Sequence, residues 1–462
     1  MTTVAVSVLK ADGSENITTT PLEDNHFSAG EVDKGEPISL SVALLNNGNQ
    51  LVGFGRLEQP IIPQGNTESS VEIPVRKPIV YIATGGMPHT IDTTLDALDP
   101  KYQGTLDAGG TTNLVVPIDG TELAVLGDTS LARVTTAEHK AVGQPVAMNF
   151  GTVIDAASVP GQRQVVVATT MGLAIVDVDS GNVTTKPLAA PNRIAIGGSA
   201  DAGFTAYVLS GRVPAPILGQ PCQGTSTVIA VALDGGTELP TTITSNAPLS
   251  DIAAAGDAVY GANPCSGEVK RLDAGEPKVS LTATGASALA IERNRLWATG
   301  SLTSSTEGAR IVLASVDLDG SNAQTVKLPP KTEVMTFDGD TKGELSINMH
   351  ADTLVAEDLA VLPGAQTVAM ITRMDSHRAA RFDSGTGAEV IPTMDAVIDD
   401  IVLADTATGS IIQRIRASCT LDDHMPNNAE FDAWSCIVIT GAEAPAGGEM
   451  IPVSVGALYG GR

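Results

Sequence analysis

Short runs of alternating apolar and polar residues recur along most of the chain. Residues 173–177 alternate apolar and small side chains, residues 179–182 (DSGN) have turn chemistry, and residues 183–188 resume a β-rich pattern. This combination predicts two short strands joined by a tight turn. The preceding segments VIDAASV and QVVVAT predict two more strands, and no window shows a sustained helical period. The chain is therefore expected to be all-β.

Four-stranded units of about 40 to 50 residues repeat from residue 77 onward. Two successive units read RIAIGG, FTAYVLS, TVIAVALD, TTITS and DIAAAG, AVYGAN, EVKRLD, KVSLTA. Repeats of this kind predict a β-propeller, most simply with seven blades. Eight blades is the alternative, because residues 383–385 (DSG) could mark an additional unit. Most units place an Asp in the turn after the third strand, where its carboxylate can accept a backbone hydrogen bond; these residues are Asp99, Asp179, Asp234, Asp273, Asp319 and Asp405.

The repeat pattern divides the chain near residue 76. Residues 1–76 contain strand-like runs separated by Gly and Asn turns and predict a small Ig-like β-sandwich domain. Residues 77–462 predict the propeller. Its first unit contains only three predicted strands, so the C-terminal segment MIPVSVGALYG is expected to supply the inner strand and close the ring. Long intervals between repeat motifs predict insertions near 331–355, 374–396 and 417–450.

Three outer hairpins, GLAIVDVDSGNV, VLASVDLDGSN and IVLADTATGSII, resemble those of bacterial seven-bladed propellers of the broad YVTN/NHL-like kind. The resemblance covers roughly residues 77–462. It implies the architecture, because families of this kind include ligand-binding, scaffold and enzymatic members. No catalytic residue is carried over from it.

The four cysteines predict disulfide bonds. Cys222 and Cys265 lie in equivalent loops of consecutive units, where their Cα atoms can approach to the roughly 5.5 Å of a disulfide. Cys419 and Cys436 flank an acidic, turn-rich segment that a bridge would close. Four buried thiols are the alternative, and no spacing typical of a metal site is present. Two bridges indicate an oxidising compartment, so we expect an extracytoplasmic protein whose signal or lipid-anchor sequence has been removed.

The net charge of −26 argues against nucleic acid and anionic lipid as partners, because like charges repel. No apolar run approaches the roughly 20 residues of a transmembrane helix. Gly, with 47 residues, and Pro, with 27, fit short strands joined by many turns.

The inner strands carry polar residues at corresponding positions, which predicts a candidate axial ligand site. Three carboxylates and one guanidinium could converge there and hold a polar ligand, a water network, or calcium or another divalent ion. The alternative is that they bond to neighbouring backbone. The members are Asp155, Arg193, Asp251 and Asp358.

Two other features have a less specific pattern. The DVDSGN and DLDGSN stretches, at Asp177 and Asp317, resemble calcium loops but lack the distal Glu, so hairpin turns are expected. Phe431 and Trp434 could form an aromatic contact for a partner, although packing against a disulfide is the alternative.

The sequence favours a non-catalytic, exported or surface-displayed propeller without a cofactor, which binds a protein or assembles with itself in the cell envelope. No GxSxG elbow or P-loop is present. The alternative is a metal-dependent hydrolase or lyase that uses the axial carboxylates.

Overall fold

The computed structural model describes most of the chain and contains strands but no helix in the described part, so no helix there could span a bilayer. The described residues are 3–10, 15–22, 26–29, 32–47, 51–57, 60–65, 70–83, 89–92, 103–105, 113–199, 202–214, 222–233, 241–273, 276–280, 284–292, 294–302, 308–337, 345–362, 367–378, 381–382, 389–391, 394–423, 436–437, 443–444 and 454–459.

The N-terminal region forms one four-stranded antiparallel sheet with the order β2-β1-β3-β4. Alternate valines of β1, such as Val4 and Val6, are buried against a layer that includes Phe27 and Ile73. The predicted sandwich would have a second sheet in the place of this layer. Within the described residues, the layer contains only isolated bridges. Prolines in residues 60–76 lack the amide hydrogen that a continuous ladder needs. The strands are β1 (Thr3–Lys10), β2 (Glu15–Pro21), β3 (Ile38–Leu45) and β4 (Leu51–Arg56).

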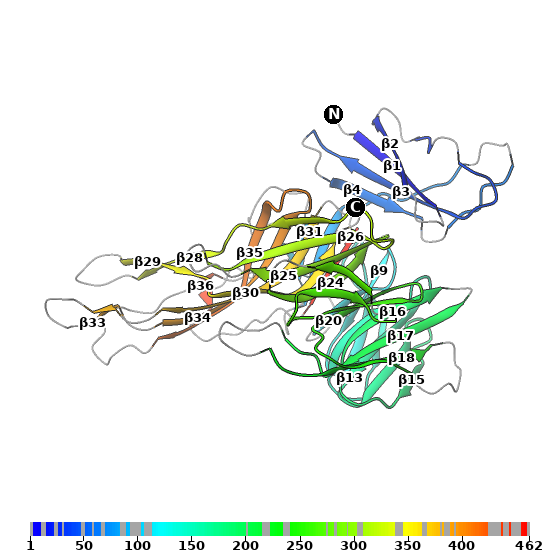
Figure 1. The fold of residues 1–462 in the computed structure, drawn as a ribbon. Helices are drawn as coiled ribbons and strands as arrows, with labels where there is room; N and C mark the ends of the chain where they lie inside the picture. The colour runs from blue at the N-terminus through cyan, green and yellow to red at the C-terminus, as the bar shows by residue number, and fades with distance from the viewer. Residues whose placement is uncertain are drawn as a thin grey trace.

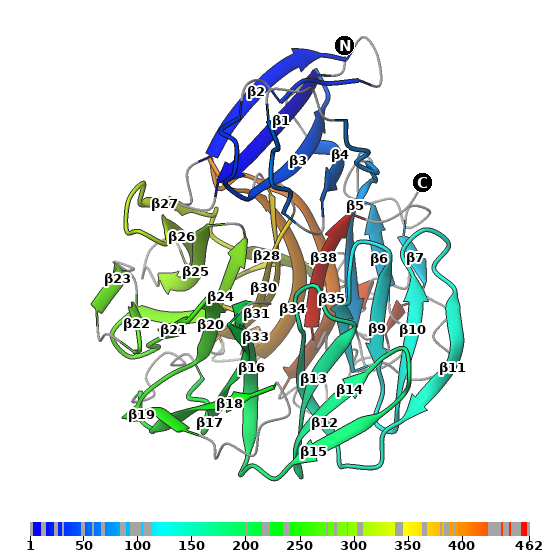
Figure 2. The same ribbon diagram turned by 90° about the vertical axis from the view of Figure 1, so that its right-hand side faces the viewer.

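The remaining described chain forms a β-propeller of four-stranded antiparallel sheets (Figure 2). The first blade combines the C-terminal strand β38 (Ser454–Tyr459) with β5 (Pro78–Ala83), β6 (His89–Asp92) and β7 (Gln103–Thr105), and β38 pairs with β5. The second blade contains β8 (Leu114–Pro117), β9 (Glu122–Leu126), β10 (Ser130–Thr135) and β11 (Ala141–Ala147). The third contains β12 (Val153–Ser158), β13 (Gln164–Thr169), β14 (Gly172–Asp177) and β15 (Val183–Lys186).

The next blades follow the same order along the chain. The fourth contains β16 (Pro191–Ser199), β17 (Gly203–Ser210), β18 (Ser226–Ala232) and β19 (Thr241–Ala247). The fifth contains β20 (Asp251–Ala255), β21 (Ala258–Ala262), β22 (Glu268–Arg271) and β23 (Glu276–Ser280). The sixth contains β24 (Thr284–Glu292), β25 (Arg295–Leu302), β26 (Arg310–Asp317) and β27 (Gln324–Lys327). The seventh contains β30 (Thr353–Val361), β31 (Thr367–Arg378), β34 (Met394–Asp405) and β35 (Ile411–Asp423).

The inner strands β38, β8, β12, β16, β20, β24 and β30 contact one another in that order, and β30 contacts β38. The hydrophobic core lies between adjacent blades. Strands there are buried on both faces and are rich in Val, Ala, Ile and Leu. One interblade cluster, for example, joins Val166 and Leu173 of the third blade to Phe204 and Val208 of the fourth. The C-terminal strand thus completes the sheet that begins the propeller.

Strands of the seventh blade extend beyond the ring. The β31–β34 ladder continues to the pair Arg378 and Met394, and β32 (Arg381–Phe382) then pairs with β33 (Glu389–Ile391). Much of the insertion predicted near 374–396 is therefore a long hairpin, which we call the blade 7 hairpin (residues 374–396). Residues 383–385 lie outside the described residues. A second hairpin, β28 (Thr332–Phe337) and β29 (Leu345–His350), precedes the blade, and both project to the left in Figure 1. The short strands β36 (Cys436–Ile437) and β37 (Glu443–Ala444) pair with each other.

Candidate functional site

Three of the predicted axial residues come together at the inner strands. Arg193 on β16 lies between the carboxylates of the two neighbouring blades. Its Nη1 is 3.9 Å from Asp155 Oδ1, and its Nε is 3.7 Å from Asp251 Oδ1. The side chains are 17%, 16% and 11% exposed, respectively, so the ion pairs are largely shielded from water. The repeat places these residues near the beginnings of successive inner strands, which explains their convergence.

The axial carboxylates also accept backbone hydrogen bonds. Asp155 accepts one from Ile194 N at 2.7 Å, which joins the third blade to the fourth. Asp251 accepts one from Leu289 N at 2.7 Å, which joins the fifth blade to the sixth. Asp358 accepts one from the adjacent Leu359 N at 3.0 Å. Each carboxylate therefore has a structural partner in the protein.

Arg193 reaches farther than its two neighbouring blades. Its Nη2 donates to the backbone oxygen of Glu357 in β30 at 3.3 Å, a contact across 164 residues of sequence. The electrostatic effect of Asp358 on Arg193 and Asp155 places that carboxylate in the same group of charges. Arg193 thus connects the third, fourth, fifth and seventh blades, and we call Asp155, Arg193, Asp251 and Asp358 the axial cluster.

Burial perturbs the acids of this region. Loss of hydration raises the pKa of Asp155 to about 6, although the Arg193 charge opposes the rise. The same cause raises the pKa of Asp251 and of the nearby Glu357. For Arg193, burial acts to lower the pKa, but the surrounding carboxylates outweigh it and keep the pKa above its usual value. Arg193 therefore holds its positive charge over a wide pH range, while the pKa values of Asp155 and Asp251 lie above the usual range of an Asp carboxyl.

The axial cluster offers carboxylate oxygens, which are the ligands that calcium prefers. Its oxygens are instead engaged by backbone amides and by one guanidinium. Among the described residues, no group of three or more His, Cys, Asp or Glu is arranged to hold a metal ion. The arrangement fits a polar brace better than an open coordination site, which needs a free position for water or substrate.

Asp177 and Asp405 act as turn residues in the outer hairpins, whereas Asp179, the residue expected to accept the backbone hydrogen bond in its turn, bonds to Arg163 instead. Asp177 Oδ1 accepts hydrogen bonds from Ser180 N at 2.8 Å and from Asp179 N at 3.2 Å. The Ser180 amide is the main cause of a lowered pKa at Asp177. Asp405 makes the same pattern with Thr408 N at 2.7 Å and Ala407 N at 3.1 Å. The resemblance to calcium loops therefore reflects hairpin formation.

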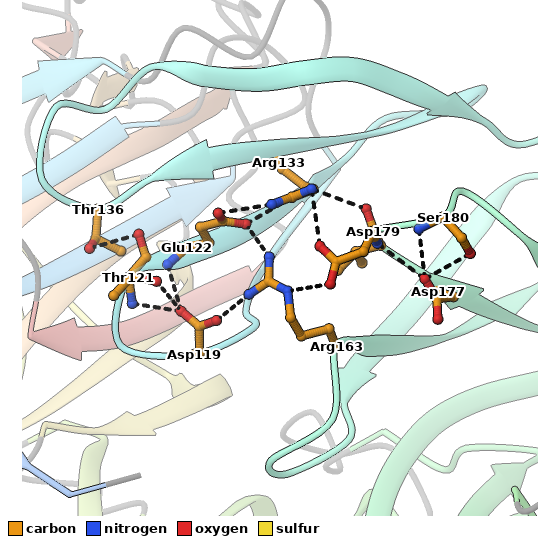
Figure 3. Close-up of polar contacts among 10 residues, drawn as sticks. Asp119, Thr121, Glu122, Arg133, Thr136, Arg163, Asp177, Asp179 and Ser180 are labelled. Atoms are coloured by element: carbon orange, nitrogen blue, oxygen red, sulfur yellow. Dashed lines mark hydrogen bonds and ion pairs between the residues drawn. The ribbon is translucent and has the colours of Figure 1, made fainter.

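A charged cluster that the repeat pattern did not indicate lies between the second and third blades (Figure 3). Arg163, in the first turn of the third blade, bonds to Asp119, to Glu122 Oε2 at 2.6 Å and to Asp179 Oδ2 at 2.7 Å. Arg133 Nε bonds to Glu122 Oε2 at 2.8 Å. These side chains join equivalent turns of neighbouring blades. The sequence places acids and an arginine in turns about one repeat apart, but this pattern is too unspecific to predict the cluster.

A second unpredicted cluster lies between the sixth and seventh blades. Lys331 Nζ donates to Asp400 Oδ2 at 2.6 Å, and both side chains are at most 1% exposed. Arg414 Nε and Arg416 Nε each lie 3.7 Å from an oxygen of the same carboxylate. Burial of an ion pair is costly unless both charges are well compensated. Substitution of a residue in this cluster should therefore lower the stability of the fold.

The predicted bridge between Cys222 and Cys265 is present. The Cα atoms are 5.4 Å apart, and the bond links the loops that follow β17 of the fourth blade and β21 of the fifth. Cys419 and Cys436 lie in β35 and β36, and their side chains are outside the described part of the structure. The candidate partner contacts Phe431 and Trp434 also lie outside the described residues.

No protein-family model matches the chain, and no curated protein matches it. The solved structures that are similar to the chain at low identity include the following three. A 6-phosphogluconolactonase-like protein from Bacteroides uniformis has 11% identity and a TM-score of 0.38, over 75% of this chain and 100% of its own. A protein of unknown function from Bacteroides caccae has 10% identity and a TM-score of 0.35, over 83% and 99%. Dihydro-heme d1 dehydrogenase NirN, solved in complex with DHE, has 11% identity and a TM-score of 0.37, over 77% and 75%.

Likenesses of this strength carry no argument about function. The fold assignment rests on the order of the four-stranded sheets and on the contacts between their inner strands. On that evidence the chain is an all-β protein with a β-propeller and an additional N-terminal sheet.

Proposed function

We propose that this protein is an extracytoplasmic, non-catalytic propeller scaffold that binds a protein partner through the blade 7 hairpin. The propeller is the rigid part of this design, and the hairpin is the part that departs from the repeat. Binding residues are commonly found where loops or insertions extend from a regular scaffold. The partner is a protein of the cell envelope.

The observation that carries the proposal is the internal use of the axial cluster. Arg193 lies within 4 Å of two carboxylates, those of Asp155 and Asp251, and bonds across the ring to Glu357 O. A metal-dependent hydrolase on the axis would need carboxylate oxygens free to coordinate an ion with an open position. Here the oxygens of Asp155 and Asp251 accept backbone hydrogen bonds from the next blade. This use of the acids favours a bracing role.

The asymmetry of the ring supports a binding role for the seventh blade. Its strands β31 and β34 have 12 residues each and β35 has 13, whereas the inner strand β30 has 9. The third and fourth blades have no strand longer than 9 residues. The extra length projects away from the ring in Figure 1 and presents a ribbon that the propeller does not need for closure.

The disulfide supports the proposed compartment. Bridges such as Cys222–Cys265 persist in oxidising environments and are rare in the cytosol of mesophiles. We also propose that the ring has seven blades in total and belongs to the YVTN/NHL-like kind. The innermost strands of these blades are β38, β8, β12, β16, β20, β24 and β30.

The blade 7 hairpin can be shortened at a defined place. Arg378 and Met394 are directly paired, so an Asn-Gly turn can replace residues 379–393 and still close β31 onto β34. The wild-type protein, this shortened variant and Asp155→Asn are purified by tag from cross-linked cell envelopes. Quantitative mass spectrometry should find a protein that is retained by the wild type and Asp155→Asn but reduced at least tenfold with the shortened hairpin.

The same preparations distinguish the enzymatic alternative. A stoichiometric divalent ion, measured by elemental analysis and lost in Asp155→Asn, would favour a metal-dependent hydrolase or lyase. A partner list unchanged by the shortened hairpin, with circular dichroism matching the wild type, would overturn the proposed binding surface.

A further inference from the structure

Strand β2 is the outermost strand of the N-terminal sheet, on the side away from β4. Strand β2 pairs with β1 and, in the described part of the chain, with no other strand. The opposite edge is covered, because Phe54 of β4 exchanges hydrogen bonds with Arg76 at 2.7 Å and 2.9 Å. That edge also lies beside β5 and β38 of the first blade. An open edge presents unpaired amide and carbonyl groups to another strand.

β2 has few of the features that normally protect an edge strand. It pairs with β1 in one unbroken register from Thr3 and Pro21 to Leu9 and Glu15. Residues 16–20 (NITTT) carry no charge and no proline. Most of the strand is exposed, including Ile17 at 60%. Charges, prolines, bulges and short length are the usual means of preventing edge pairing, and β2 has only its terminal Glu and Pro.

The outer strands of the propeller blades are each interrupted or short. β11 and β23 contain Pro145 and Pro277 and have shifted registers. β19 and β35 also have register shifts. β7, β15 and β27 have only three or four residues. Edge pairing is thus disfavoured around the ring but permitted at β2.

We propose that β2 pairs antiparallel with β2 of a second copy of this chain. A two-fold register centred on Thr18 places Thr18 opposite its own copy, Ile17 opposite Thr19, and Glu15 opposite Pro21. No like charges face each other in this register, and Ile and Thr form favourable cross-strand pairs. Two copies would then share a continuous eight-stranded sheet, held by main-chain hydrogen bonds.

The charge of the chain explains why the contact is confined to β2. Each copy has a net charge of −26, so close approach elsewhere is repulsive. At 0.15 M salt the Debye length is about 8 Å, which screens the bulk of this repulsion from an uncharged strand. The dimer should therefore weaken at low ionic strength. The β2 contact does not involve the blade 7 hairpin, so the dimer proposal is independent of the proposed partner binding.

The test uses the full chain and charged substitutions on the two-fold axis. Thr18→Lys and Thr18→Glu each place two like charges opposite each other across the two-fold axis. The Thr18 side chain is exposed, so folding should be retained in both variants. Thr184→Lys, at an exposed position of the four-residue strand β15, is the matched control. Mass is measured by sedimentation equilibrium up to about 100 μM at 0.02 M and 0.3 M salt.

The wild type and Thr184→Lys should approach twice the monomer mass at 0.3 M salt and less at 0.02 M. Each Thr18 variant alone should stay monomeric, and an equimolar mixture of Thr18→Lys and Thr18→Glu should dimerise again, because opposite charges then face each other. A monomeric wild type, or a Thr18→Lys dimer as stable as the wild type, would overturn the proposal. So would a wild type that stays monomeric while it binds an unrelated strand-forming peptide.

Discussion

Replacement of Arg193 by Met tests the bracing role of the axial cluster most directly. The variant keeps most of the apolar length of the side chain but leaves Asp155 and Asp251 without their common positive neighbour. It also removes the hydrogen bond to Glu357 O. The carboxylates then have two options, which are to stay charged in a shielded site or to take up protons.

The expected magnitude follows from the distances. Unit charges about 4 Å apart interact by roughly 4 kcal/mol at an effective dielectric constant of 20. Desolvation offsets part of this energy, and removal of one partner from a buried ion pair typically costs about 3 to 5 kcal/mol. We expect a loss in that range at pH 8. At pH 5 the loss should fall to roughly 1 to 2 kcal/mol, because protonated carboxyls need no counter-charge.

The sign can be worked out from Asp155. Its folded pKa of about 6 exceeds the ordinary 3.8, so the native state binds more protons than the unfolded state between these values. Stability therefore falls as pH rises from about 4 to about 6. The 2-unit difference corresponds to roughly 3 kcal/mol at 1.36 kcal/mol per pKa unit. Loss of Arg193 should raise the pKa further and shift this window to higher pH.

The assay is equilibrium unfolding in urea at pH 5, 6.5 and 8, followed by circular dichroism and tryptophan fluorescence. Arg295→Met is the control, because it removes a similarly shielded arginine from an ion pair with Asp317 that lies within one blade. A loss for Arg193→Met that is equal at pH 5 and pH 8, or below 1 kcal/mol at pH 8, would falsify the bracing role.

Three other perturbations probe contacts between blades. Removal of the disulfide with Cys222→Ser and Cys265→Ser should lower the free energy of unfolding by about 4 kcal/mol, since the bond closes a segment of 43 residues, and urea unfolding measures this. Arg163→Met should cost about 1 kcal/mol at low salt and less in 1 M NaCl, because its partners are partly exposed, and thermal unfolding at both salt concentrations checks it. Lys331→Met should cost about 1.5 to 3 kcal/mol by removing a hydrogen bond to the buried Asp400 carboxylate, which keeps Arg414 and Arg416 as neighbours, and adding Asp400→Asn should recover part of that loss in urea.

Each of these expectations has a clear contrary result. Dithiothreitol should destabilise the wild type by about 4 kcal/mol more than it destabilises the double Ser variant, which has no Cys222–Cys265 bridge to reduce. A salt-independent loss for Arg163→Met would mean that packing, and not charge, dominates that cluster. If Lys331→Met and the double variant with Asp400→Asn unfold alike, the buried pair is not the source of the sensitivity.

Local patterning was sufficient to predict the strands, the turns and the repeat. The Asp177 turn is encoded within four residues, and the structure has the corresponding hydrogen bonds from Ser180 and Asp179. The bridge between Cys222 and Cys265 followed from their equivalent places in consecutive units. These features depend on short-range geometry and on a repeat that can be counted along the chain, and therefore the sequence alone contains them.

Other features depend on which side chains meet across blades. Arg193 reaches Glu357 O over 164 residues, and Lys331 meets Asp400 over 69. The irregular layer that covers the N-terminal sheet was also not predicted from the sequence. Its prolines lack the amide hydrogens that a second hydrogen-bonded sheet would need. Hydrophobic periodicity specifies which face of a strand is buried, but not the register and reach of polar side chains between sheets. Those contacts are set when the ring closes, because only then does each inner strand acquire its neighbours.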